Sequence, residues 1–474
     1  MNRASSFQCM LVNFSSMFTC PSFWNFMTLA CGFVLCNGRR TISRVIQLGC
    51  FTEEQRHHSI FYRFLSRAVW FPNELGKRIL RLALDLGLLP ENMRIILTVD
   101  DTLCRKSGAH IWGGNMHHDA LLSNYGRGKS LVRFFSFGHN WVIVCVCIQT
   151  PWNANRWMAV PIAFRLYRSK KRCPKEQYRK RTQLAREMVA EINTWLPRDR
   201  AVILVGDTEY ACREVVRGLP KRIRFVGPMS MDAALFDPPP VNAKGRGRPR
   251  KKGRRLLSPG QLIAAEDIPW EPREMLLYGK TVTVLTKTQT CLWYTVAGGR
   301  LVRMIVTRDP SGRIEDRAYF STDAEMSVHE IAQSFSLRWT QEEMHRNVKQ
   351  HLGLEDPQNG WWRRPKGRRR NKKIPGPQPH KKRGEKAVTR TVPFILTIYA
   401  LVVLWYFANG TAREDVERAR RRAPWYREKI EPSFSDMLAA LRRHLWAERN
   451  FSEPRYEQGA SKINADLLDW LCAA

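Results

Sequence analysis

The chain has 474 residues, and 78 Lys and Arg against 43 Asp and Glu give a formal net charge of +35. A hydrophobic share of 44% is enough to form a core, which excludes a fully disordered basic protein. A surface with this much positive charge attracts polyanions. We therefore expect nucleic acid as the partner, ahead of anionic membranes and acidic small molecules.

Cysteines and apolar runs indicate a cytoplasmic protein without a membrane partner. The twelve Cys include no Cys-x-x-Cys pair, which disfavours zinc and favours reduced core thiols. The apolar stretch at residues 9–36 is interrupted by polar side chains and Pro21. A second run, residues 392–407, is shorter than the roughly 20 residues that span a bilayer. We predict that both are buried helices.

Residues 1–90 predict helices. Residues 61–86 carry apolar side chains at helical spacing beside five Lys and Arg, among them Arg63 and Arg67. Basic amphipathic helices of this kind are typical of a DNA-binding module, and equally of helices whose basic faces are simply solvated.

After residue 90 the sequence pattern changes to short apolar runs that are typical of strands. We predict strands at residues 94–100, 130–148, 160–166 and 201–206, with a helix at 175–196 between the last two. Strands interleaved with a helix in this way indicate an α/β core.

A Pro-rich and basic stretch follows, and after it we predict a β-rich insertion with strands at residues 281–286, 292–296, 301–306 and 317–320. Ser327-x-x-Glu330 is a capping box, which predicts a helix running to about His351. The predicted division is residues 1–90 (helical DNA-binding domain), 91–228 (core, first part), 229–324 (insertion with a basic loop), 325–410 (core, second part) and 411–474 (helical tail).

Three acidic positions stand out. Asp100 and Asp101 end the first predicted strand, Asp207 follows another, and Glu342 or Glu343 lies on the capped helix. Carboxylates that converge from two strand ends and a helix hold two Mg²⁺ ions about 3.5–4 Å apart for phosphoryl transfer. The alternative is that each Asp merely caps a turn.

One face of the capped helix has a regular polar pattern. Phe335, Arg338, Glu342, Arg346 and Lys349 follow at intervals of 3, 4, 4 and 3 residues, which places them on one helical face. A surface ladder of ion pairs would give the same spacing, because Arg338 and Glu342 form an i, i+4 pair.

Phe335-x₂-Arg338-x₃-Glu342-x₆-Lys349 resembles the Tyr-x₂-Arg-x₃-Glu-x₆-Lys signature of DDE transposases of the insertion-sequence-four superfamily, with Phe in place of Tyr. Asp-Asp-Thr at 100–102 and Gly-Asp-Thr-Glu-Tyr-Ala at 206–211 also fit. The resemblance implies an RNase H-like core with a β insertion between the second Asp and the Glu. It further implies a metal-binding catalytic triad of Asp101, Asp207 and Glu342 that uses Mg²⁺, with Mn²⁺ as a substitute. Asp101 is preferred because the family's Asp directly precedes Thr, although the pattern does not separate it from Asp100.

The resemblance also implies DNA contacts by Arg338, Lys349 and Phe335, the last without the hydroxyl of Tyr. Lys106 lies five residues after Asp101 in the sequence. It is either a contact to substrate phosphate or an ordinary surface lysine. Arg246 and Arg248 lie in an Arg-Gly-Arg-Pro sequence that resembles an AT-hook, which fits a narrow minor groove. A second basic cluster at residues 363–386 indicates backbone binding or a solvated linker.

These features together predict a DNA transposase. It would act on the inverted-repeat ends of its element and on target DNA, as a homodimer in the synaptic complex, in the cytoplasm at the nucleoid. The alternatives are a non-catalytic DNA-binding protein derived from a transposase, and a hydrolytic nuclease on the same core.

Overall fold

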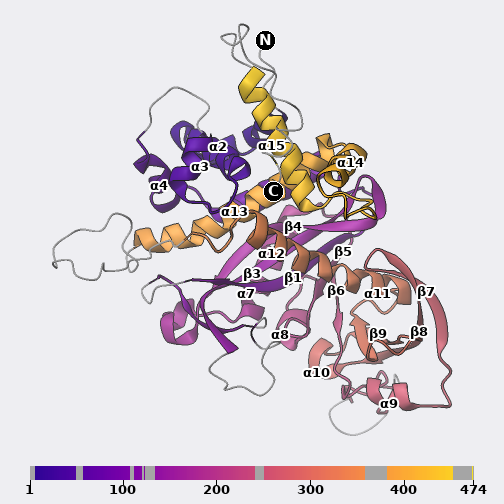
Figure 1. The fold of residues 1–474 in the computed structure, drawn as a ribbon. Coiled ribbons are helices and arrows are strands. Elements are labelled where there is room, and N and C mark those ends of the chain that lie inside the picture. The colour runs from indigo at the N-terminus through magenta and orange to yellow at the C-terminus, as the bar shows by residue number, and fades with distance from the viewer. Residues whose placement is uncertain are drawn as a thin grey trace.

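The computed structural model describes residues 6–49, 57–106, 111–119, 122, 134–240, 250–357, 382–451 and 472. Within these residues a single mixed sheet runs through the molecule, with helices packed on it (Figure 1). Its strands are β1 (Ile95–Arg105), β2 (Asn115–His118), β3 (Phe135–Thr150), β4 (Asn153–Tyr167), β5 (Val202–Gly206), β6 (Ile223–Pro228), β7 (Glu271–Leu277), β8 (Lys280–Leu292), β9 (Leu301–Arg308) and β10 (Arg317–Ser321).

The helices gather at the two ends of the chain and on both faces of the sheet. They are α1 (Ser6–Val12), α2 (Cys20–Leu35), α3 (Ile42–Gly49), α4 (Ser59–Ser66), α5 (Pro72–Asp85), α7 (Arg181–Trp195), α8 (Arg213–Val216), α9 (Pro259–Ala264), α10 (Tyr294–Ala297), α11 (Val328–Ser336), α12 (Arg338–His351), α13 (Lys382–Asn409), α14 (Ala412–Arg422) and α15 (Phe434–Phe451). Short 3₁₀ turns lie at Ser15–Met17, Lys170–Arg172 and Lys175–Gln177.

The core of the sheet has the strand order β4-β3-β1-β5-β6. The first three strands are antiparallel, and β1, β5 and β6 are parallel. All five residues of β5 are buried, as expected of a parallel strand that is covered on both faces. The predicted α/β core of the RNase H-like class is confirmed.

Side chains of β5 alternate between two apolar clusters. Leu204 belongs to the large cluster that includes Met188 and Ile192 of α7, whereas Ile203 and Val205 belong to the cluster that includes α11. The period of two along a strand therefore sends neighbouring residues toward different helices. The same alternation decides the geometry of the candidate site.

The insertion continues the core sheet. β10 pairs antiparallel with β6, and β9, β8 and β7 follow outward in that order. The strand predicted at residues 292–296 is wrong, because β8 ends at Leu292 and the helix α10 begins at Tyr294. Sequence reasoning also missed β7, which begins Glu-Pro-Arg-Glu and has apolar residues only at 275–277 beside Pro272; its edge position tolerates the proline.

The capped helix begins where predicted. The Ser327 hydroxyl accepts from the Glu330 backbone N–H at 3.2 Å, and a Glu330 carboxylate oxygen accepts from the Ser327 backbone N–H at 3.1 Å. The predicted single helix is nevertheless two, because α11 ends at Ser336 and α12 begins at Arg338. Phe335 and Glu342 therefore lie on different helices.

α13 passes between the N-terminal helices and the sheet and packs against α2, α4, α5 and β4 (Figure 1). In the described residues it contains the one segment, Gly384–Asn409, that is long and apolar enough to cross a membrane. Of its most apolar window, 94% is buried inside the protein, as in the core helix of a soluble protein. α2 also lies largely within the main core. The two apolar runs are the buried helices that the sequence predicts.

The N-terminal helices pack closely because glycines lie at the contacts. A Cβ added at Gly76 of α5 would lie 1.6 Å from the Ile162 carbonyl oxygen of β4. No side chain fits that distance, so the helix lies directly on the strand. Gly299, in contrast, has no other heavy atom within 4 Å of the added Cβ.

We predict that Gly76→Ala lowers the free energy of unfolding by about 1–3 kcal/mol, the usual cost of overpacking, because α5 must move off β4. Urea denaturation would measure the change. Gly299→Ala is the matched control and is expected to change stability by less than about 1 kcal/mol. Equal stability of the two variants would show that α5 does not depend on this contact.

Candidate active site

The Asp pair lies inside a strand and not at its end. β1 continues to Arg105, five residues beyond Asp100, so both Asp residues are paired with β3. Asp100 is opposite Ile143 and Asp101 is opposite Val142. Because successive side chains of a strand point to opposite faces, the two carboxylates leave the sheet in opposite directions.

Asp100 faces α12. An Arg338 guanidinium nitrogen lies 3.5 Å from Asp100 Oδ2, and the other terminal nitrogen lies 2.6 Å from Glu342 Oε1. Gln341 of the same helix donates to the Ile143 carbonyl at 3.0 Å, which holds α12 on this face. The predicted i, i+4 ion pair thus exists, but its arginine also reaches the sheet.

Asp207 follows β5 and turns the chain. Its Oδ1 accepts from the backbone N–H of Glu209 at 2.9 Å and of Tyr210 at 3.3 Å. This cap is the alternative role that the sequence left open for each Asp. Asp207 lines the same groove as Arg338, the partner of Asp100, and its charge helps to raise the pKa of Asp100.

The pKa values of Asp100 and Asp207 are both raised, above all by burial. Burial, then the charges of Asp207 and Asp101, raise the pKa of Asp100 to about 8, although Arg338 opposes the shift. Burial also raises the pKa of Asp207, where backbone hydrogen bonds and Arg338 act in the other direction and Asp101 adds to the rise. A cation bound here would relieve this repulsion.

Asp101 faces the start of α7. Its Oδ2 accepts from Asn140 at 2.6 Å and from Arg181 at 3.0 Å. Arg181 also pairs with Glu209 at 2.7 Å. The structure therefore brings Glu342 to Asp100 through Arg338, and holds Asp101 on the opposite face. The preference for Asp101, which rests on its place directly before Thr102, stays a prediction. The structure shows that the two carboxylates of the pair leave β1 on opposite faces.

A groove of about 340 Å³ opens beside Asp207 and Arg338. Phe335 lines it, only 9% exposed, with its ring centroid 4.5 Å from that of Tyr319. Arg317 and Tyr319 of β10 also line the groove, and sequence reasoning missed both. Arg317 and Tyr319 are two residues apart on a strand, so their side chains share one face of the sheet. That spacing was the signal in the sequence that could have found them. Tyr319 brings a phenol hydroxyl to a groove in which Phe335 has none.

Lys106 is buried and bound to backbone carbonyl groups of the chain itself. It is 9% exposed, and its Nζ donates to the carbonyl oxygens of Glu355 at 2.9 Å and Pro357 at 2.8 Å. Burial lowers its pKa. The lysine ties the end of β1 to the segment after α12. Lys349 instead lies at the C-terminal end of α12, away from the groove, and lines a separate pocket.

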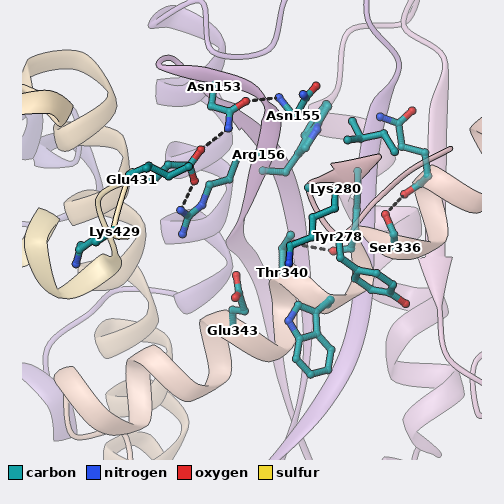
Figure 2. A pocket seen from close by; sticks show the side chains of 17 residues that line it. Asn153, Asn155, Arg156, Tyr278, Lys280, Ser336, Thr340, Glu343, Lys429 and Glu431 are labelled. Atoms are coloured by element: carbon teal, nitrogen blue, oxygen red, sulfur yellow. Dashed lines mark hydrogen bonds and ion pairs between the residues drawn. The ribbon is translucent and has the colours of Figure 1, made fainter. Parts of the chain in front are cut away.

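Another cavity of about 450 Å³ lies on the side of α12 that carries Glu343 (Figure 2). Trp339, which is 47% exposed, lines it. Glu431 accepts hydrogen bonds from Asn153 and Arg156 at one wall, so that carboxylate is already occupied (Figure 2). Trp339 is therefore not a core packing residue.

Arg246, Arg248 and the segment 358–381 lie outside the described residues.

Among the residues that are described, no three His, Cys, Asp or Glu side chains lie close enough to hold a metal ion as they stand. His117 and His118 form no such site with Asp119, because Asp119 accepts from Arg105 and Ser136. At the acidic cluster, the Arg338 guanidinium occupies the position between Asp100 and Glu342 where a cation would bind. The donors there are carboxylate oxygens, the kind that Mg²⁺ prefers, so the residues fit such an ion in chemistry.

The candidate site thus combines carboxylates from β1, from the turn after β5 and from α12. A profile described as DDE superfamily endonuclease matches residues 24–294, more than half of the chain. The protein therefore belongs to the DDE superfamily of endonucleases, whose members generally use divalent metal ions. The match includes both members of the Asp pair and Asp207, and it ends before α12.

Two other comparisons add less. A search of curated proteins finds no match. A cryo-EM structure of the piggyBac transposase synaptic complex with hairpin DNA is similar at 9% identity and a TM-score of 0.37, over 92% of this chain and 74% of that one. A likeness at that TM-score supports no argument about this protein.

We predict that Lys106→Met lowers the free energy of unfolding by about 1.5–3 kcal/mol, because two carbonyls lose a charged donor. DNA affinity should stay unchanged. Denaturation and DNA titration would measure the two effects, with Lys77→Met on the exposed side of α5 as the control. A Lys106→Met variant with wild-type stability but weak DNA binding would instead show that Lys106 contacts DNA.

Proposed function

We propose that the protein is a transposase of the insertion-sequence-four superfamily. It would cleave double-stranded DNA at the inverted-repeat ends of its element and join them to target DNA. The observation that supports this best is that Arg338 joins Asp100 of β1 to Glu342 of α12 and lines one groove with Asp207, which follows β5. The groove beside them carries Arg317 and Arg338, which suits a phosphate backbone.

Asp100, Asp207 and Glu342 form the proposed triad. Asp100 replaces the initially preferred Asp101 because it shares Arg338 with Glu342. Mg²⁺, or Mn²⁺ in its place, would when bound activate the attacking oxygen and stabilise the leaving one. Arg338 would leave the carboxylates for a DNA phosphate, so its charge stays in the site and changes partner.

The reaction has two parts. Hydrolysis breaks a phosphodiester bond at the element end and frees a 3′-hydroxyl. That hydroxyl then attacks a target phosphate, and the target's own 3′ oxygen leaves with the proton. The helices of residues 1–90 would hold the DNA outside the active site, and a homodimer would bring the two ends together. A nuclease on the same core would stop after the hydrolysis, so joined products identify the transposase.

We predict that Asp100→Asn, Asp207→Asn and Glu342→Gln each reduce cleavage of end-containing DNA at least roughly a hundredfold, because the three carboxylates act as a unit and each change removes one of them. Asp101→Asn should retain more activity than Asp100→Asn. Single-turnover cleavage with Mg²⁺ would measure this, with Glu343→Gln on the same helix as the control. A more damaging Asp101 substitution would return the first position to Asp101.

We predict that EDTA abolishes cleavage while DNA binding persists and weakens steeply with salt, because binding depends on Lys and Arg. Cleavage gels and fluorescence anisotropy on one preparation separate the two steps. Added Mg²⁺ should restore cutting. Metal-independent cleavage would contradict the proposed mechanism.

A further inference from the structure

A pocket of about 380 Å³ separates the turn between α2 and α3 from the C-terminal end of α12. The described side chains that give it its charge are Arg39, Arg40, Lys349, Asp356 and Arg442, with Gln350 at the rim. Four of the five are basic. The pocket lies outside the groove at Asp207, although α12 reaches both.

Arg40 forms the buried wall of the pocket. Its guanidinium donates to the carbonyl oxygens of Phe33, Gly38 and His351, so it joins the end of α2 to the end of α12. The Arg40 backbone N–H donates to Asp356 Oδ2 at 2.9 Å. A Cβ at Gly353 would lie 2.2 Å from that oxygen, so only glycine leaves room for this arrangement.

The field in the pocket is positive. Burial lowers the pKa of His351, and the charges of Arg442, Arg40 and Arg346 lower it further, whereas Asp436 acts weakly in the other direction. Carbonyl oxygens accept the hydrogen bonds of the Arg40 guanidinium, and Asp356 is the one acidic side chain among four basic ones in the described lining. Buried cations are stabilised by an anion nearby, which makes an anion a fitting occupant of this pocket.

The pocket lies in line with the proposed active site. Lys349 is seven residues after Glu342 on α12, which is about 10 Å along the helix axis. A DNA strand at Glu342 could thus run along α12 to Lys349. Arg39, which is exposed on the facing turn, would then meet the same strand from the N-terminal side.

We propose that this pocket binds one backbone phosphate of the DNA, an inference that rests on the proposed function. Arg39, Lys349 and Gln350 contact the phosphate oxygens. Arg40 holds the two walls together and adds its charge. The phosphate thereby links the N-terminal helices to the helix that carries Glu342, so DNA held by the first is aligned with the second.

The test is the salt dependence of binding to a mixed-sequence DNA duplex, because phosphate contacts do not depend on sequence. The slope of log K against log salt falls by about 0.9 for each phosphate that the protein ceases to neutralise. We expect that fall for Arg39→Gln and for Lys349→Gln. The double variant should show the same single fall, because both residues hold one phosphate. Arg413→Gln, whose side chain is 93% exposed on α14, is the control and should match wild type.

A slope for Arg39→Gln equal to that of wild type would overturn the proposal that the pocket binds DNA. A fall of about 1.8 in the double variant would show that Arg39 and Lys349 contact two different phosphates. Inorganic phosphate is the second probe. If it stabilises wild type but not Arg39→Gln in thermal melts while the DNA slopes stay equal, the pocket binds a free anion and the proposal fails. Wild-type protein that binds DNA but never cuts it would overturn the proposed function and leave the slope comparison intact.

Discussion

The organisation of this protein depends on one arginine held between carboxylates that repel each other. Asp100 and Asp207 are close and largely withdrawn from water, and Glu342 approaches them on a separate helix. Arg338 reaches Asp100 and Glu342 together, so α12 is held on the sheet by charge as well as by apolar contact. Without a cation this arrangement is unfavourable, because buried like charges repel strongly. Arg338 supplies the positive charge that offsets this repulsion.

Much of the fold could be predicted from the sequence. The apolar run of β5, the helical period of α7 and the capping box at Ser327 each follow from local chemistry, and the structure has all three. Local sequence patterns were less informative where the secondary structure of a segment depends on the segment that packs against it. β7 is a strand because β8 pairs with it, and Leu337 divides a helix whose sequence is continuous by pattern.

The candidate site shows the same division. The motifs by themselves bring Asp207, Glu342 and Arg338 to one region. They do not separate Asp100 from Asp101, because the two differ in the face of β1 from which they project and in the helix that packs on that face. The surroundings of Lys106 could not be predicted for a related reason. Its charge suggested phosphate, whereas the segment after α12 provides carbonyl oxygens for it, and sequence cannot show a contact between residues 249 apart.

The continuous sheet has a consequence for how the protein can vary. β10, at the end of the insertion, lies between β6 and β9, so it is the border strand of the core and belongs to both parts. Removing the whole block would strip β6 of its neighbour and expose an unpaired edge, which invites aggregation. The exchangeable portion is therefore smaller than the insertion that the sequence suggests, and consists of the outer hairpin β7–β8. Natural or engineered relatives should differ in length there and retain β10.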